Sequence, residues 1–395
     1  MKQDYFAFFY GKTNNIFISE LFARILYAIY IIKFNVQKLT IKNVICHIDN
    51  AKETLPLIYP KPKYQINLVN PPINPNVDIS IIVPVYNYRE VIPACIDSLI
   101  NQKTKYQLEI ILIDDGSTDG ASDICDDYAA RNNVKVIHQN NGGIGAARNT
   151  GLNHATGKYV MFVDCDDVVH DDFVEIMLDE AYHTGNDIVI CGYNLIKKRN
   201  GKIISQREIE CSTHNLMGYR DDEDLIMNYQ GLPWNKICKR EIYNYIRYLP
   251  GLWYEDTILH FLVFRKCRSF SYVNRALYDY MWYEKNFSHT QSKVSAKSIE
   301  RYWFLEFMAE ETRRVGLPLD RGFYKTLLRH SGARLYTGIH GYDENAEKAA
   351  FSLTCDMLRE YQPQQPYSLT YFEKKLERAL LSNNIGKWRF ISQYI

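Results

Sequence analysis

The stretch Asp78-Ile-Ser-Ile-Ile-Val-Pro-Val-Tyr-Asn87 is an apolar, β-branched run that ends in a turn. It opens an alternation in which each short apolar run is followed by a helical pattern. The expected strands are 79–83, 108–113, 134–138, 159–163 and 187–192, and the expected helices are 89–101, 121–130, 145–155 and 172–182. Strands without polar alternation are typical of a mainly parallel sheet covered by helices on both faces. The sequence therefore predicts an α/β fold, with ligands beyond the carboxyl ends of the strands.

The pattern changes on either side of this alternating region. Residues 70–76 are rich in Pro and Asn, which disfavour helix and strand and are typical of a linker. From about Ser298 onward, charged and apolar residues recur at helical spacing. We therefore predict an amino-terminal extension and linker over residues 1–76, the central α/β domain over 77–295 and a helical carboxyl-terminal region over 296–395.

The composition is that of an ordinary globular chain. Its 395 residues carry 47 Lys and Arg against 46 Asp and Glu, so the formal charge of +1 gives no reason to expect a nucleic-acid partner. The nine cysteines are scattered without C-x-x-C pairs, so we expect a reducing cytosol and no zinc site. The amino terminus lacks the pattern of a secretory signal, so none is expected.

An amphipathic segment runs from Ile16 to Phe34. Its most apolar part, Ile25 to Ile32, is flanked by charges and is far shorter than the roughly 20 residues that span a bilayer. Apolar residues recur here at helical spacing beside charged ones, which suits a helix docked on the protein or one lying on a membrane surface. Docking is the favoured interpretation.

Acidic residues cluster where two expected strands end. Asp114-Asp115-Gly116-Ser117 closes the second strand, where a carboxylate can accept hydrogen bonds from a base or ribose, although Asp-Gly-Ser is also common turn chemistry. Asp164-Cys-Asp-Asp167 follows the fourth strand, and so much negative charge calls for a cation. Hard oxygen ligands favour Mg²⁺ or Mn²⁺. The alternative is a solvated acidic cluster that caps the next helix.

Between these clusters lies a glycine-rich turn that opens a helix, Asn141-Gly-Gly-Ile-Gly-Ala-Ala-Arg-Asn149. Such a turn can bring backbone close to a phosphate. A dinucleotide fingerprint is disfavoured, because Arg148 stands at its third glycine position and the turn follows the third strand instead of the first.

These segments resemble, in order along the chain, the motifs of the inverting family 2 glycosyltransferases of the GT-A fold, specifically the bacterial enzymes that build surface polysaccharides. The segments that carry the resemblance are Asp78–Asn87, Ile113–Asp119, Asn141–Gly151 and the D-x-D motif in Val163–Asp167. Further on, Pro233-Trp-Asn-Lys236 resembles the acceptor-side segment and Glu255-Asp256 the family's E-D motif. Relatives often carry arginine where this chain has Met281, and Lys285 or His289 could supply that positive charge.

The resemblance assigns roles to individual residues. Donor-binding residues would be Pro84, Val85 and Tyr86 beside the nucleoside, Asp115 at the base, Arg148 on the nucleotide side and Asp164 at the ribose. Asp166 and Asp167 would hold Mn²⁺ or Mg²⁺. Trp234 and Asn235 would line the acceptor side, while Asp256, with Glu255 beside it, would supply the general base.

The resemblance implies transfer of a sugar from a nucleotide-diphosphate donor, with UDP favoured, to a glycan or lipid-linked glycan hydroxyl. One displacement inverts the anomeric centre, as expected for capsule, lipopolysaccharide or exopolysaccharide synthesis. Such an enzyme is expected in the cytoplasm, and association with the inner face of the membrane and homo-oligomer formation stay open. The alternatives are a sugar nucleotidyltransferase, which is disfavoured because no glycine-rich loop follows the first strand, and a catalytically inactive glycan-binding or scaffold protein.

Overall fold

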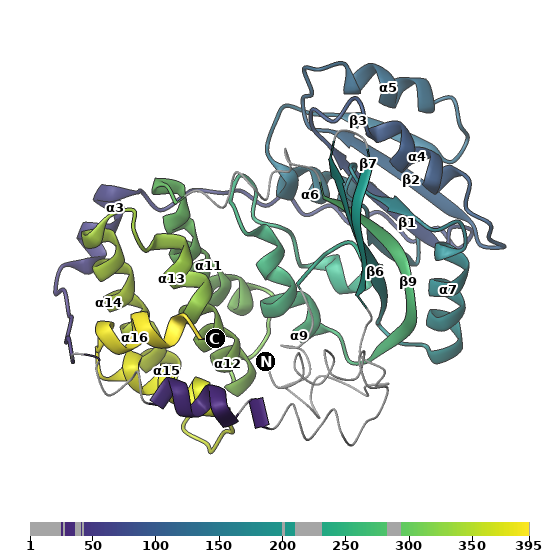
Figure 1. Ribbon diagram of the computed structural model, residues 1–395. Helices are drawn as coiled ribbons and strands as arrows, with labels where there is room; N and C mark the ends of the chain where they lie inside the picture. The colour runs from purple at the N-terminus through teal and green to yellow at the C-terminus, as the bar shows by residue number, and fades with distance from the viewer. Residues whose placement is uncertain are drawn as a thin grey trace. The chain divides into compact units, whose positions relative to one another are not determined.

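The computed structural model describes residues 25–26, 28–35, 41, 43–199, 202–209, 231–282 and 294–394. The chain divides into two compact units, the larger formed by Pro56–Thr326 and the smaller by Met1–Leu55 with Leu327–Ile395. The larger unit contains the whole sheet (Figure 1). Both predicted domain boundaries, near residues 76 and 295, fall inside this larger unit, and the three-part division stays a prediction.

The larger unit is built on a nine-stranded sheet with the order β3-β2-β1-β4-β8-β6-β9-β5, and β7 pairs with β6 at the side. The strands are β1 (Ile79–Val85), β2 (Leu108–Asp114), β3 (Val134–His138), β4 (Tyr159–Phe162), β5 (Val168–Val169), β6 (Ile188–Arg199), β7 (Lys202–Ile209), β8 (Lys236–Lys239) and β9 (Phe270–Trp282). The first four in the order are parallel to one another, whereas β8 is antiparallel to both β4 and β6. The predicted α/β fold is confirmed, and its parallel character is complete in this β3-β2-β1-β4 half.

Helices cover both faces of the parallel half. They are α4 (Ile92–Ile100), α5 (Ala121–Tyr128), α6 (Ile144–His154) and α7 (Phe173–Thr184). Ile81 and Val83 of β1 point into the core shared with α4, while Ile82 between them faces α6. A Cβ on Gly151 would lie 2.2 Å from Cγ2 of Ile82, so glycine alone lets α6 pack this closely on β1.

Further helical elements lie after β8 in the chain, and the last of them, α12, begins in the larger unit and ends in the smaller one. They are the 3₁₀ turns η1 (Arg240–Asn244) and η2 (Glu255–Thr257), the π-helix η3 (Leu259–Val263), α9 (Phe264–Lys266), the 3₁₀ turn η4 (Ala296–Ile299), α11 (Glu300–Arg314) and α12 (Arg321–Arg329). From Glu255 to Lys266 the chain thus passes through three hydrogen-bonding patterns, a 3₁₀ turn, a π-turn and an α-turn. A π-turn inside a helix is often found at a functional site.

The smaller unit is helical. Its elements are η5 (His330–Arg334), α13 (Leu335–Ile339), α14 (Glu344–Tyr361), α15 (Tyr371–Leu381) and α16 (Ile385–Ser392), and α3 (Ala51–Ile58) begins in it. Helical residues 28–35 belong to the same unit, and the fully buried ring of Phe34 lies 5.0 Å from that of Phe372 and 5.1 Å from that of Phe390. Among the residues described, we find no helix with the length and apolarity that crossing a membrane requires.

Candidate functional site

The carboxyl ends of β1 and β2 place the first predicted donor-binding residues side by side. Val85 pairs with Asp114 across the two strands, and its carbonyl accepts a hydrogen bond of 2.8 Å from the backbone N–H of Asp115. Pro84 and Val85 are buried within β1. Tyr86, the first residue past the strand, is 45% exposed and is the member of this group that a ligand can reach.

Asp115 and the glycine-rich turn form one hydrogen-bonded unit. The carboxylate of Asp115 is buried and accepts hydrogen bonds from the backbone N–H groups of Gly142 and Gly143, at 2.9 and 2.8 Å, and from the side chain of Gln139 at 2.6 Å. Burial raises the pKa of Asp115, although these donors oppose the shift. The turn approaches this closely because Gly143 adopts a φ of +82°, which favours glycine. Two motifs 27 residues apart thus form the same wall of the site.

Arg148 joins the two acidic motifs. Its side chain is 2% exposed, and it bonds to Asp164 at 2.9 Å and to Glu255 at 2.6 Å. Burial alone would lower the pKa of Arg148, but the two carboxylates raise it further than burial lowers it, so the guanidinium stays charged. The ring of Tyr248 lies 5.3 Å from its guanidinium carbon. The structure thus directs both terminal nitrogens of Arg148 to protein carboxylates, and its predicted contact with a nucleotide stays a prediction.

Asp166 and Asp167 have different surroundings although they are neighbours. Asp167 is fully buried, and its carboxylate accepts hydrogen bonds of 2.7 Å from the Tyr278 hydroxyl and from the backbone N–H of Met281, both on β9. Burial raises the pKa of Asp167 well above its usual value. Asp166 is partly exposed, and burial together with the charge of Asp164 raises its pKa to about 7.

These surroundings can be compared with the needs of a divalent cation. Mg²⁺ and Mn²⁺ prefer oxygen ligands and often keep only one or two protein carboxylates beside water and substrate phosphates. Asp166 fits this role, since its carboxyl lies beside the negative charge of Asp164 and a cation would favour its ionised form. Asp167 fits it less well, because both of its oxygens are bonded to β9. In the described part of the chain, no three His, Cys, Asp or Glu side chains are grouped as a ready-made metal site.

The predicted base lies on η2, which begins after Tyr254, a residue with a φ of +65°. Glu255 is buried, and burial raises its pKa to about 7, which the charge of Asp256 reinforces and Arg148 opposes. Asp256 is partly exposed. Glu255 is therefore held inward by Arg148, and Asp256 is the more accessible carboxylate of the pair.

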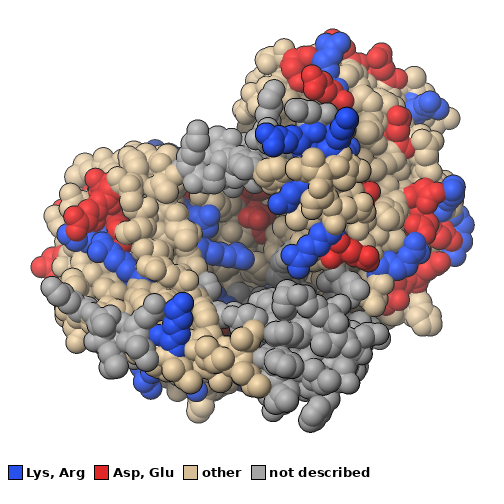
Figure 2. Space-filling model, viewed as in Figure 1, with Lys and Arg blue, Asp and Glu red and all other residues tan. Residues whose placement is uncertain are grey.

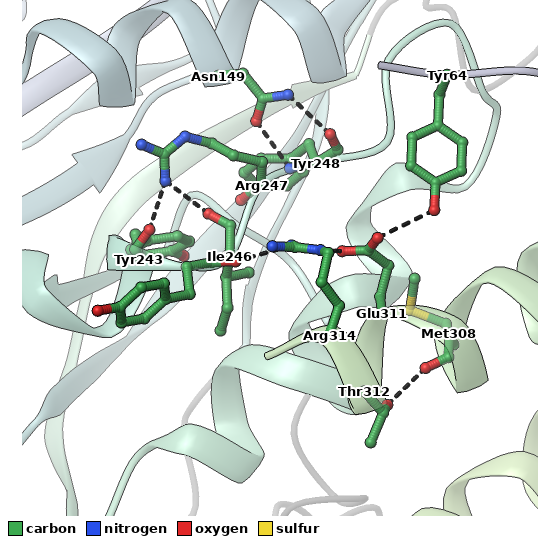
Figure 3. A network of polar contacts seen from close by, with 11 residues as sticks. Tyr64, Asn149, Tyr243, Ile246, Arg247, Tyr248, Met308, Glu311, Thr312 and Arg314 are labelled. Atoms are coloured by element: carbon green, nitrogen blue, oxygen red, sulfur yellow. Dashed lines mark hydrogen bonds and ion pairs between the residues drawn. The ribbon is translucent and has the colours of Figure 1, made fainter. Parts of the chain in front are cut away.

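The segment before η2 is fixed on α6. The side chain of Asn149 donates to the carbonyl of Tyr248 and accepts from its N–H, both at 2.8 Å (Figure 3). Nearby, the N–H of Gly251 donates to the carbonyl of Gly142 at 3.1 Å. A Cβ on Gly145 would come within 3.0 Å of the Leu249 carbonyl oxygen, so the first turn of α6 depends on glycine for this contact. The helix that carries Arg148 therefore also positions the backbone leading to Glu255.

Trp234 and Asn235 are buried beside this site. Trp234 is 4% exposed, and its ring stacks on Tyr278 with a centroid distance of 4.4 Å and on Tyr280 at 5.3 Å. The amide of Asn235 donates to the carbonyl of Cys191 at 2.9 Å. Both side chains are thus engaged in packing and hydrogen bonds within the protein, and their acceptor-side role stays a prediction.

Some participants were missed by sequence reasoning, and others cannot be placed. Gln139 carries no motif, although it lies two residues before the glycine-rich turn. Tyr278 lies in the segment 277–282, which resembles the family segment with arginine where this chain has Met281, but it was given no role of its own. Asn149 follows Arg148 directly and could have been suspected as a helix residue with hydrogen-bonding capacity. Lys285 and His289, the candidates to replace the arginine absent at Met281, lie outside the described residues.

The fold and this arrangement define a class of proteins: an α/β sheet with carboxylates at its strand ends, one of which, Asp164, shares a buried arginine with Glu255 of η2. The sequence model of glycosyl transferase family 2 matches residues 80–246. The glycosyltransferase GlyA of Streptococcus pneumoniae is 31% identical over 78% of this chain and 44% of its own length. The uncharacterized glycosyltransferase YibD of Escherichia coli is 30% identical over 61% of this chain and 73% of its own length. The chain belongs to glycosyl transferase family 2.

A solved structure shows the same fold. Residues 1–349 of Staphylococcus aureus TarS, in complex with UDP-GlcNAc, match with a TM-score of 0.61 and 20% identity, over 80% of this chain and 91% of that one. The predicted family and GT-A fold are confirmed. The chain spans less than half the length of GlyA, so the activity of that whole protein is not transferred to it.

Proposed function

We propose that this protein transfers a sugar from a nucleoside diphosphate donor, with UDP favoured, to a hydroxyl of a glycan acceptor in bacterial surface-polysaccharide synthesis. One observation carries the proposal: the buried Arg148 bonds both to Asp164 of the D-x-D motif and to Glu255 of the E-D motif. Two motifs about ninety residues apart are thereby held at one site. The complex of TarS with UDP-GlcNAc supports the choice of donor.

The donor side is formed by the β1 and β2 ends. Tyr86, exposed past β1, would border the nucleoside, and the unit of Asp115 with the glycine-rich turn would receive the base. Asp164, which is 23% exposed in its side chain, would contact the ribose while Arg148 fixes its orientation. Asp166 would hold Mn²⁺ or Mg²⁺, and a bound cation would neutralise charge that develops on the leaving diphosphate.

The acceptor side needs a group that removes a proton. Asp256 would take the proton from the attacking hydroxyl as that oxygen bonds to the anomeric carbon and the bond to the diphosphate breaks. One displacement on the face opposite the leaving group inverts the anomeric centre. Glu255, bonded to Arg148, would hold η2 in place and leave Asp256 facing the acceptor.

The acceptor is proposed to be a glycan or lipid-linked glycan, reached from the cytoplasm. Trp234 and Asn235 would support its side of the site from within the packed core, through Tyr280 and β8. Peripheral attachment to the inner face of the membrane and association of two copies are compatible with this proposal.

The replacement Asp256→Asn tests the proposal most directly. Asparagine keeps the shape but takes no proton, so transfer should fall by on the order of a hundred- to ten-thousand-fold. The affinity for UDP with Mn²⁺, which depends on the other side of the site, should change little. Turnover and UDP titration of the purified variant measure both quantities.

Glu255→Gln is the matched neighbour. If Asp256→Asn keeps full transfer while Glu255→Gln loses it, the base is Glu255. If both stay active, the E-D motif is not the base. If the unaltered protein neither transfers nor hydrolyses any nucleotide sugar in a screen with Mn²⁺, the inactive glycan-binding alternative gains support.

A further inference from the structure

The segment that leads into η2 is also held by a second helical turn, apart from α6. Three residues on one helical turn, Lys297, Glu300 and Arg301, contact the residues directly before Glu255. This turn, where η4 passes into α11, lies beyond the 80–246 stretch that matches the family model. It belongs to the larger unit, as does the segment that it contacts.

Glu300 makes the central contact. Glu300 is 2% exposed, and both oxygens of its carboxylate accept hydrogen bonds. Oε2 accepts from the backbone N–H of Trp253 at 2.7 Å, and Oε1 accepts from the hydroxyl of Tyr59 at 2.6 Å. Hydrogen bonds to an ionised acceptor are short and strong. The bond to Trp253 is made to the main chain only three residues before Asp256, so it fixes the path of the backbone.

Its two neighbours hold the adjoining residues. The ammonium of Lys297 donates to the carbonyl of Gly251 at 3.3 Å and lies 5.2 Å from the ring centroid of Trp253. The guanidinium carbon of Arg301 lies 3.8 Å from the ring centroid of Tyr254. Tyr254 has a φ of +65°, which is unfavourable for a residue with a Cβ and persists only where surrounding contacts impose it.

We infer that Glu300 is a positioning residue for the E-D motif: through Trp253 it sets the backbone from which Asp256 reaches the acceptor. The inference rests on the proposed role of Asp256. The two sets of contacts hold different residues: α6 holds Tyr248 and Glu255, whereas the α11 turn holds Trp253 and the strained Tyr254. Gly251 is bonded both to Lys297 and to the glycine-rich turn before α6. A carboxylate displaced by about 1 Å can lose a hundredfold in rate, so the second set of contacts matters for turnover.

The same helix offers a matched control. Glu311 is 3% exposed, accepts from the hydroxyl of Tyr64 at 3.0 Å and pairs with Arg314 at 2.6 Å (Figure 3). It thus ties the segment before the sheet to α11 in the way that the Tyr59–Glu300 bond does, but its carboxylate bonds to Tyr64 and Arg314 and not to residues 251–256. Replacing Glu311 tests what loss of a buried carboxylate on α11 does by itself.

The experiment compares Glu300→Ala, Glu300→Gln and Glu311→Ala in the full chain, with melting temperature, kcat for transfer and the Kd for UDP with Mn²⁺. Both alanine variants should melt at lower temperature. Only Glu300→Ala should lower kcat, by roughly ten- to a hundredfold, with an unchanged Kd. Glu300→Gln should restore most of kcat, because the amide oxygen can accept from Trp253 while its NH₂ donates to Tyr59.

Other results would overturn the inference. Equal loss of stability with normal kcat per folded molecule in both alanine variants would make Glu300 merely structural. If Glu300→Ala does not fold, Arg301→Met decides, since it removes the cation over Tyr254 from a partly exposed position, and normal kcat in that variant counts against positioning. Full activity of Asp256→Asn would instead refute the role of Asp256 as the base, on which this inference rests, independently of how Glu300 behaves.

Discussion

Two adjacent aspartates show how local surroundings separate residues that a sequence motif groups together. Asp167 is fully buried and ties the turn between β4 and β5 to β9 through Tyr278 and Met281. Asp166 is partly exposed, with a pKa raised to about 7 by burial and by Asp164. The sequence could not rank the two, because side chains in a turn after a strand do not alternate between buried and exposed positions with a fixed period. We therefore expect Asp166 to bind the metal and Asp167 to maintain the fold.

Alanine variants of the two aspartates should lose different properties, stability in Asp167→Ala and metal-dependent UDP binding in Asp166→Ala. Asp167→Ala leaves the Met281 N–H and the Tyr278 hydroxyl buried without their partner, which should lower the free energy of unfolding by about 1–3 kcal/mol. Asp166→Ala should cost less stability but remove the Mn²⁺ dependence of UDP binding. Urea unfolding and UDP titration with and without Mn²⁺ measure both effects. Retained Mn²⁺ dependence in a folded Asp166→Ala variant would contradict the metal assignment.

At the scale of elements, His138 joins the ends of β2 and β3 to α5. Its Nδ1 lies 2.8 Å from Asp114, which closes β2, and its Nε2 lies 3.0 Å from Asp126 on α5. Asp114 also accepts from the hydroxyl of Ser122 on α5 at 2.6 Å. Asp115 follows Asp114 directly in the chain, so these bonds also support the wall of the site that is proposed to receive the base.

The link through His138 should make stability depend on pH. Its pKa is raised, first by the hydrogen bond to Asp114 and then by that to Asp126, so the folded protein holds this proton more tightly than the unfolded chain. The stabilisation is complete below the unfolded pKa of about 6.5 and is lost as pH rises through the folded value. The melting temperature of His138→Asn should therefore fall below that of the unaltered protein by more at pH 5.5 than at pH 8.5.

The exposure of His138 sets the expected size of the pH effect, and a second histidine provides the control. The His138 side chain is 46% exposed, so solvent screens its ion pairs and the difference should be small. His183, exposed in the last turn of α7, serves as the matched position. A difference for His138→Asn that does not change with pH, or one that His183→Asn reproduces, would show that the Asp114 pair does not stabilise the fold in this way.

Local signals predicted the elements of the parallel half but not the contacts between distant ones. The strand at 134–138 has the predicted bounds, and β1 and β2 differ from prediction by one or two residues at one end, because each is a single apolar run between turn residues. The antiparallel insertion of β8 between β4 and β6 has no such signal. It depends on pairing of Tyr159 with Lys239, which are 80 residues apart.

The candidate site was predictable in its acidic and glycine motifs and not in what connects them. Arg148 could be named from its motif, but its bond to Glu255, 107 residues away, depends on how α6 packs on the segment at 248–251. Glu300 had no signal at all, because a glutamate at the start of a helix is ordinarily solvated. Burial of such a group is decided by tertiary packing, which one sequence does not display.

At the scale of the whole molecule, the smaller unit is formed by residues from both the first and the last part of the chain. Met1–Leu55 and Leu327–Ile395 together form one compact body, while Pro56–Thr326 form the other. Within the smaller body, Phe34 contacts α15 and α16 through Phe372 and Phe390, and Tyr30 lies against Phe372 with a centroid distance of 5.7 Å. The amino-terminal helix thus has one face docked, whereas Ile29 and Ile32 on it are 54% and 62% exposed.

The two faces of this helix should respond differently to truncation. Phe34→Ala removes a fully buried ring from an aromatic cluster and should cost about 3–5 kcal/mol, with faster amide exchange in α15 and α16 and unchanged exchange in β1 to β4. Ile32→Ala, at an exposed position, should change stability by no more than about 0.5 kcal/mol. Equal destabilisation by the two variants would contradict one-sided docking. A helix docked through Phe34 still presents Ile29 and Ile32 outward. If the unaltered protein binds anionic lipid vesicles and Ile32→Ala loses this binding while it keeps its melting temperature, this exposed face is the one that meets a membrane surface.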